Sequence, residues 1–465
     1  EIESICGGKG ICGKCKVKVM EENSSNPHAV PTVNRLSPWT EEEAKHITRQ
    51  QREDGYRLAC LARITGDILV YIPEESRPGV QVVRKEARHI DFLLDPTVKL
   101  YTMAVSQPTL QDPAADFERI SRQIREQNGL DHLQVDHMVV ERMSRIVRES
   151  GWDIDVLLWE NKEIIDIRAA KSASPLGLAV DIGTTTIAGY LCDLTTGELL
   201  STVSMMNPQV KYGEDVMSRI AYARMYPGTG LEKMNADVID GINTIISRAA
   251  ASCGRSAEDI CDMTVVGNTA MHHIFLRIDP DPLGLSPFTP AIQRSMDVKA
   301  WELGIKINPG AYVHVLPIEA GFVGADNVGV LICEEPYRRD DMTLIIDVGT
   351  NGELVLGNRH RLMSASCATG PAFEGAQIAF GMRAAEGAIE RVRIDPSTME
   401  VDYRVIGRQQ WRSQSRPQEM RARGICGSGI LDATAEMFRC RIIEKSGVFN
   451  NGIKSERIRK NNEGL

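Results

Sequence analysis

Residues 178–186, Leu-Ala-Val-Asp-Ile-Gly-Thr-Thr-Thr, decide the fold of the larger part of this chain. An apolar strand runs into a tight turn there, and strand character resumes from Ile187 to Leu191. Backbone amides and threonine hydroxyls of such a hairpin can wrap phosphate oxygens. An aspartate at the strand end can orient water on Mg²⁺. The stretch therefore predicts a phosphate-binding turn formed by Asp181, Gly183, Thr184, Thr185 and Thr186.

The same device recurs 166 residues later. Residues 344–353 read Leu-Ile-Ile-Asp-Val-Gly-Thr-Asn-Gly-Glu, and a Val-Val-Gly-Asn-Thr segment at 265–269 lies between the two turns. One such turn alone is commonly a plain hairpin, whereas the pair favours a clamp on the β- and γ-phosphates of ATP with Mg²⁺. A Walker-type P-loop is not found in the sequence. The candidate residues of the second turn and the connecting segment are Asp347, Gly349, Thr350, Asn351, Gly352, Glu353, Gly267 and Asn268.

Strands and helices alternate from residue 173 onward. Apolar strands at 177–183, 264–269 and 344–350 end in glycine-rich turns, and a helical stretch at 232–253 lies between the first two. This alternation predicts an α/β layer architecture with a parallel or mixed sheet.

The first sixty residues hold four cysteines with the spacing C-x5-C-x2-C-x44-C, namely Cys6, Cys12, Cys15 and Cys60. A 2Fe–2S cluster needs four thiolates, and the glycines between the first two let the backbone curl around it. The loop resembles a variant of the plant-type ferredoxin pattern. Two weaker alternatives remain. A zinc site would suit the C-x2-C pair but usually uses two C-x2–4-C knuckles, and four buried structural thiols would not need this glycine content.

The composition limits the possible partners. The chain has 465 residues, of which 42% are hydrophobic and 25% charged, with a net charge of −9. An acidic balance argues against a nucleic-acid or anionic-membrane partner. No apolar run reaches membrane-spanning length, because Glu319, Asp326 and Asn327 interrupt the stretch at 315–332. No secretory leader precedes the cysteines, so we expect a cytoplasmic protein with reduced thiols.

We expect four regions. Residues 1–76 form a ferredoxin domain with a strand at 16–20 and a helix after Pro38; residues 77–100 form a linker. Residues 101–172 form a small α+β domain with helices at 112–124 and 132–149 and a strand pair at 154–159 and 164–168. Residues 173–465 form the α/β domain that carries both phosphate-binding turns. The expected class is α/β and α+β multidomain.

The order DIGTTT, VGNTAM, DVGTNGE resembles the phosphate and connecting segments of the acetate-kinase, sugar-kinase, heat-shock-ATPase and actin superfamily. Joined to the cysteine loop, it resembles the reductive activators of corrinoid proteins. Supporting strings are PFTPA at 287–291, LPIEAGFVGAD at 316–326, ATGPAFEGAQIAFGMRA at 368–384 and GICGSG at 424–429. The resemblance covers essentially the whole chain.

This resemblance implies a partial β-grasp ferredoxin domain, an actin-like ATPase domain and the roles of individual residues. Cys6, Cys12, Cys15 and Cys60 would hold a 2Fe–2S cluster, while Asp181, Asp347 and Glu353 would act on Mg-ATP. The expected activity is ATP-dependent reduction of a corrinoid protein from Co(II) to Co(I). The implied partners are that corrinoid protein, a low-potential electron donor and a second copy in a homodimer.

Two departures from the family pattern lead us to expect a chain truncated at both ends. The strands that precede the cysteine loop are absent, and no Gly-Gly pair of an adenosine segment follows residue 8. Alternative functions are an electron carrier with an inactive ATPase-like docking domain and a redox-regulated small-metabolite kinase. Activators of hydroxyacyl-CoA dehydratases are disfavoured, because they lack an N-terminal ferredoxin loop.

Overall fold

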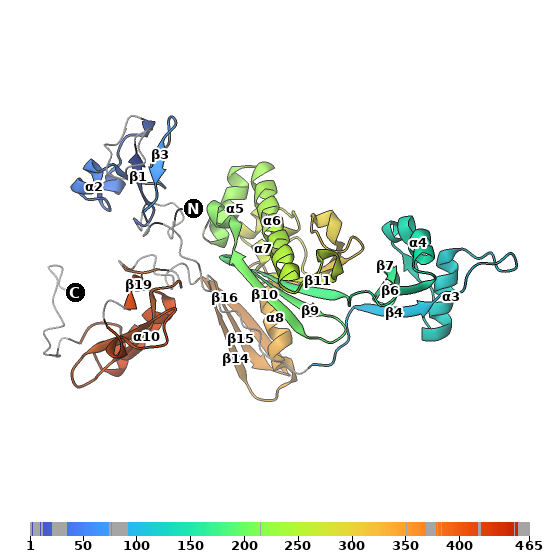
Figure 1. Ribbon diagram of the computed structural model, residues 1–465. Helices are drawn as coiled ribbons and strands as arrows, with labels where there is room; N and C mark the ends of the chain where they lie inside the picture. Colours follow the sequence, from blue (N-terminus) through green and yellow to red (C-terminus); the bar gives the residue numbers. More distant parts are fainter. Residues whose placement is uncertain are drawn as a thin grey trace. The chain divides into compact units, whose positions relative to one another are not determined.

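The computed structural model describes most of the chain (Figure 1). The described residues are 2, 10, 13–20, 35–73, 76, 92–213, 215–349, 351–368, 378, 380–382, 384–416, 420–450 and 452–453. They fall into two compact units, Lys85–Val348 with Gly352–Cys367, and Glu1–Arg84 with Gly349–Asn351 and Ala368–Leu465. Cys6, Cys12 and Thr350, which the sequence singled out, lie outside the described residues.

The N-terminal region contains a three-stranded antiparallel sheet in the order β2-β1-β3. Thr40 caps the first helix, because its hydroxyl accepts from Glu43 N while the Glu43 carboxylate accepts from Thr40 N. The elements are β1 (Lys16–Met20), α1 (Glu41–Ala44), α2 (Arg49–Glu53), β2 (Tyr56–Leu58) and β3 (Leu69–Tyr71). The predicted strand at 16–20 and the helix after Pro38 are confirmed.

The region that follows is an α+β layer built on a sheet in the order β4-β6-β7-β5 (Figure 1). Helix α4 contacts the sheet at β7, and helix α3 contacts α4. The predicted pairing of 154–159 with 164–168 is confirmed. The elements are β4 (Val98–Ala104), α3 (Asp116–Asn128), β5 (Gln134–Val135), α4 (His137–Glu149), β6 (Asp153–Trp159) and β7 (Glu163–Ala169).

Both predicted helix starts in this region were wrong. Asp112 does not start α3; its carboxylate and carbonyl instead accept from the Arg119 guanidinium at 2.7 Å each, so the helix begins only at Asp116. Residues 134–135 pair with β7 as a short strand, and Asp136 then caps α4 by accepting from Met138 N.

The core of the third region is a six-stranded mixed sheet in the order β10-β9-β8-β11-β13-β12. The strands β8, β11 and β13 are parallel, and α6 packs along β9 and β10 (Figure 1). Its elements are β8 (Leu176–Ile182), β9 (Thr186–Asp193), β10 (Leu199–Met206), α5 (Val216–Met225), α6 (Thr229–Ser252), β11 (Ile260–Gly267), α7 (Thr269–Phe275), β12 (Met296–Lys299), β13 (Tyr312–Val315) and α8 (Ala325–Glu334). The alternation of strands and helices that the sequence predicted is confirmed.

The described residues also form two smaller sheets of three strands each. One has the order β14-β15-β16, with β14 (Thr343–Val348), β15 (Asn351–Asn358) and β16 (Arg361–Ala368). The other has the order β18-β17-β19 and packs with a helix; its elements are β17 (Ala388–Ile394), β18 (Val401–Val405), β19 (Gly424–Ile425) and α10 (Gly427–Arg439). Within the described parts of the chain, we find no helix with the length and apolar character that a membrane crossing needs.

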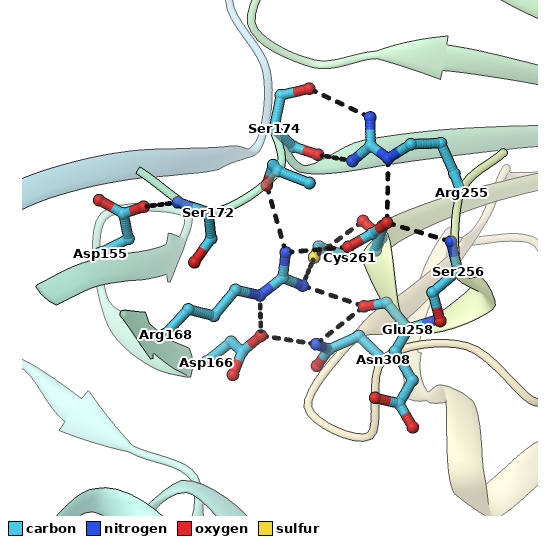
Figure 2. Close-up of polar contacts among 12 residues, drawn as sticks. Asp155, Asp166, Arg168, Ser172, Ser174, Arg255, Ser256, Glu258, Cys261 and Asn308 are labelled. Atoms are coloured by element: carbon cyan, nitrogen blue, oxygen red, sulfur yellow. Dashed lines mark hydrogen bonds and ion pairs between the residues drawn. The ribbon is translucent and has the colours of Figure 1, made fainter. Parts of the chain in front are cut away.

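The α+β region is bonded to the six-stranded sheet region through a buried polar network (Figure 2). Asp166 on β7 accepts from Arg168 Nε at 2.6 Å and from Asn308 Nδ2 at 2.7 Å. Arg168 also donates to the Glu258 carbonyl at 3.0 Å. These contacts cross from one region to the other, so both lie in one compact unit.

Candidate functional site

The first glycine-rich turn joins β8 to β9. Gly183 N donates to the Thr186 carbonyl at 2.9 Å, which closes the turn directly after Asp181 and Ile182. The Thr184 side chain is fixed as well, because Asn268 Nδ2 donates to Thr184 Oγ1 at 3.0 Å. The first turn and the connecting segment therefore meet at one edge of the sheet.

Two glycines permit this meeting. Gly267 at the end of β11 lies opposite Ile182, and a Cβ on it would come within 2.8 Å of the Ile182 carbonyl oxygen. Gly324 caps the start of α8, where a Cβ would lie only 2.4 Å from Asn268 Cα. Real Cβ atoms do not approach backbone so closely, so a larger residue at Gly324 would displace α8 from Asn268.

The second turn repeats the geometry of the first. Asp347 on β14 lies opposite Glu353 on β15, and Gly352 lies opposite Val348. Gly349 N donates to the Asn351 carbonyl at 2.9 Å, as Gly183 N does in the first turn. Each turn thus carries an aspartate two residues before a glycine whose amide closes the hairpin.

Four carboxylates near these turns lie close enough to influence one another's pKa values, namely Asp181, Asp326, Asp347 and Glu353. Burial raises the pKa of Glu353 to about 7, and the negative charges of Asp326 and Asp347 act in the same direction. Burial also raises the pKa of Asp326 to about 6, again with help from nearby negative charges, those of Asp181 and Asp347. Such a cluster of carboxylates is stabilised by a cation.

The residues suit Mg²⁺ bound together with phosphate. Among the described residues, no three histidine, cysteine or acidic side chains converge as a ready metal site. Mg²⁺ is usually held by one or two carboxylates, several waters and substrate phosphates, so a complete protein cage is not required. Asp181 and Asp347 have the chemistry for such a shared site.

Two of the four N-terminal cysteines are described, and their thiols meet. Cys15 precedes β1, Cys60 follows β2, and their Sγ atoms lie 3.2 Å apart. The hydrogen bond between the Cys15 and Cys60 thiols lowers the pKa of Cys15 to about 6, although burial opposes this effect. A thiol that ionises readily is suited to ligate a metal, so this pair fits half of a four-thiolate site.

A buried ion pair holds the segment that carries Cys60. Glu43 and Arg57 form two hydrogen bonds, of 2.8 and 2.9 Å, and Glu43 Oε1 also accepts from Leu58 N at 3.2 Å. Burial is the largest single influence and acts to raise the pKa of Glu43, but Arg57 and the backbone N–H groups of Leu58 and Thr40 together outweigh it, so the pKa is lowered.

Sequence reasoning missed three residues around the first turn. Asp326 lies in a string quoted for the family resemblance, and its signal was an acid directly after the Gly324-Ala325 start of a helix. Asn207 and Arg219 lie far from any glycine-rich motif, yet both side chains donate to backbone carbonyls of the first turn. Only the folded chain brings them there.

Comparison with known proteins accounts for this combination. Three family models match consecutive parts of the chain: the RACo linker region over 87–173, the RACo middle region over 176–338, and the C-terminal domain of RACo, the ASKHA domain, over 341–465. The corrinoid activation enzyme RamQ of Eubacterium limosum is 32% identical over 450 residues, which are 96% of this chain and 67% of RamQ. The chain belongs to the RACo family.

Two further comparisons agree with this assignment. A solved structure described as a reductive activator for a corrinoid, iron–sulfur protein matches with a TM-score of 0.69 and 34% identity, over 100% of this chain and 72% of that one. A Methanosarcina barkeri reductase named for the Co(II) methylated amine-specific corrinoid protein is 25% identical over 296 residues, and the match covers 53% of it. The family resemblance and the actin-like class expected from the sequence are thereby confirmed, while the exact domain boundaries stay a prediction.

Proposed function

We propose that this chain acts in ATP-dependent reductive activation of corrinoid proteins, the one-electron conversion of Co(II) to Co(I). One observation carries the proposal: a RACo-family chain combines the paired thiols of Cys15 and Cys60 with two phosphate-type turns and their carboxylates. A plain electron carrier would not need the phosphate-type turns, and a metabolite kinase would not need the paired thiols.

The electron-transfer half rests on the cysteines. Cys6, Cys12, Cys15 and Cys60 would hold a 2Fe–2S cluster, which supplies single electrons when bound. Cys15 is 2% exposed, so its thiolate is held away from solvent. For a one-electron step, each ~59 mV of unfavourable potential gap reduces the equilibrium constant tenfold, which explains why an energy source is useful.

The ATPase half rests on the two turns. The amides of residues 183–186 and 349–353 and the threonine hydroxyls would bind phosphate oxygens, with Gly267 and Asn268 holding the connecting segment in place. Asp181 and Asp347 would position Mg²⁺ and water. Glu353, whose pKa is raised to about 7, could accept a proton from water near neutral pH.

Partners and location follow from the same proposal. The corrinoid protein in its Co(II) form is the substrate, and a low-potential donor in the cytoplasm supplies electrons. A homodimer is the proposed assembly. Nucleic acid and membrane are not among the proposed partners, since the net charge of −9 would repel polyanionic surfaces.

The test follows Co(I) formation by visible absorbance. Anaerobically purified chain is mixed with a Co(II) corrinoid protein and a low-potential reductant, with or without Mg-ATP. We expect ATP-dependent Co(I) with the wild type and with Cys426→Ser, a thiol that is as buried as Cys15 but lies outside the cluster motif, and none with Cys15→Ser. Co(I) formation that ignores ATP would favour the electron carrier, and metabolite-dependent ADP release without Co(I) would favour the kinase.

A further inference from the structure

The first phosphate turn is held from behind by two buried side chains. The Gly183 carbonyl accepts from Asn207 Nδ2 at 2.8 Å, and the Thr185 carbonyl accepts from Asn207 N at 2.8 Å. Between them, the Thr184 carbonyl accepts from the Arg219 guanidinium. Three consecutive carbonyls of the turn therefore point toward Asn207 and Arg219, which we call the turn-support residues.

The turn-support residues are themselves fixed. Asn207 caps a short 3-10 helix, since its Oδ1 accepts from Gln209 N at 3.0 Å. Arg219 lies in the first turns of α5 and donates to the Gly213 carbonyl at 3.0 Å and to Gln209 Oε1 at 3.1 Å. Both residues are fully buried. Gln209 in turn donates to the Met234 carbonyl at 2.9 Å, so the support is anchored on α6.

The direction of the carbonyls determines the direction of the amides. In a trans peptide unit the N–H points opposite to the preceding C=O. Because the carbonyls of residues 183, 184 and 185 face the turn-support residues, the amides of Thr184, Thr185 and Thr186 face the other way. Successive amides that point to one side form a concave anion-binding surface.

Arg219 adds charge to this geometry. A guanidinium is positively charged at all ordinary pH values and is costly to bury. Its donation to the Thr184 carbonyl polarises that peptide unit, which makes the Thr185 N–H a stronger donor. A fixed positive charge directly behind the turn also favours an anion in front of it.

We propose that Asn207 and Arg219 are positioning residues that hold the first turn ready to bind the phosphates of a nucleoside triphosphate. This inference rests on the proposed function, because it assumes that the first turn receives phosphate. The residues act through the backbone of the turn, and neither touches the ligand. The arrangement is built before ligand arrives, so the ordering of the turn does not weaken binding.

The first test compares two buried asparagines of the same unit in the full chain. Asn207→Ala removes the donor to the turn, whereas Asn235→Ala removes a donor to the Ile274 and Phe275 carbonyls, away from the turn. Binding of Mg-ATP and of Mg-tripolyphosphate is measured by calorimetry, and Tm is measured in parallel. We expect both variants to lower Tm, but only Asn207→Ala to weaken both ligands, by about tenfold or more.

The second test isolates the charge of Arg219. Arg219→Lys keeps a cation, while Arg219→Gln removes it, and Arg119→Gln serves as a buried-arginine control in the α+β region. We expect Arg219→Lys to bind tripolyphosphate more tightly than Arg219→Gln, and Arg119→Gln to match the wild type. Equal weakening of binding in Arg219→Lys and Arg219→Gln, after correction for folded fraction, would overturn the role of the charge.

The outcomes separate this inference from the proposed function. Wild-type affinity for both ligands in Asn207→Ala would overturn the positioning role even if wild-type protein generates Co(I). Weakened binding in Asn207→Ala, together with no Co(I) from the wild type, would leave the positioning role standing and reject corrinoid activation. A wild type that binds neither ligand would overturn both.

Discussion

The carboxyl group of Glu353 affects both the stability of the fold and the proposed chemistry of the site. Its side chain is 7% exposed and faces the charges of Asp326 and Asp347, so its pKa rises from an ordinary 4.5 to about 7. Between these two pH values the unfolded chain releases the proton while the folded chain keeps it. The folded state therefore loses stability as pH rises through this window, and the loss is complete above about pH 7.

Glu353→Gln should remove this loss. With a chelator present to remove divalent cations, we expect the unfolding free energy of the variant to exceed that of the wild type by on the order of 2 kcal/mol at pH 8. At pH 4.5 the two unfolding free energies should be nearly equal. Urea unfolding at both pH values measures it, with the exposed Glu302→Gln as control. An advantage equal at both pH values would mean that the carboxyl does not titrate in this way. The same variant should lose ATP hydrolysis if Glu353 acts on water.

At the scale of elements, the sequence predicted what local chemistry determines. The two Asp-x-Gly turns and their flanking strands were recognisable because each is a contiguous pattern. The start of α3 was mistaken because Asp112 binds Arg119 instead of capping the helix, a choice that only the tertiary contacts decide. Asn207 and Arg219 could not be found for the same reason, since they lie 24 and 35 positions along the chain from the turn carbonyls to which they donate.

The start of α8 gives an element-scale prediction. Gly324→Ala would place a Cβ 2.4 Å from Asn268 Cα, so α8 must shift away from the connecting segment. We expect a cost of about 1–3 kcal/mol in unfolding free energy and weaker Mg-ATP binding. Gly329→Ala, inside α8, meets its nearest atom only at 3.6 Å and should be neutral or stabilising. Denaturant unfolding and calorimetric titration of both variants check the contrast; equal effects would show that the approach at Gly324 is not limiting.

At the scale of the whole molecule, the α+β region and the six-stranded sheet region belong to one compact unit. Beside the Asp166 network (Figure 2), Lys299 pairs with Asp136 at 2.7 Å and with Glu163 at 2.9 Å. Trp159 stacks on Tyr312 with ring centroids 4.2 Å apart. Polar and apolar contacts thus join the two regions at separate points, so any movement of the sheet region during the proposed ATP turnover should carry the α+β region with it.

Asp166→Asn tests this coupling. Asp166 is 2% exposed and accepts from Arg142 at 2.6 Å as well as from Arg168, so the amide would leave two partly buried guanidinium groups without their shared carboxylate. We expect a loss of about 2–3 kcal/mol, less than for a fully buried pair because both arginines retain some solvent contact. Calorimetry should then resolve separate transitions for the two regions, which we expect to unfold together in the wild type. Asp155→Asn is the matched control. The Asp155 carboxylate is also buried, but it accepts from the Thr102 hydroxyl and from Ser172 N and makes neither of these bonds to the six-stranded sheet region. A single transition in Asp166→Asn would place the coupling in the Lys299 and Trp159 contacts instead.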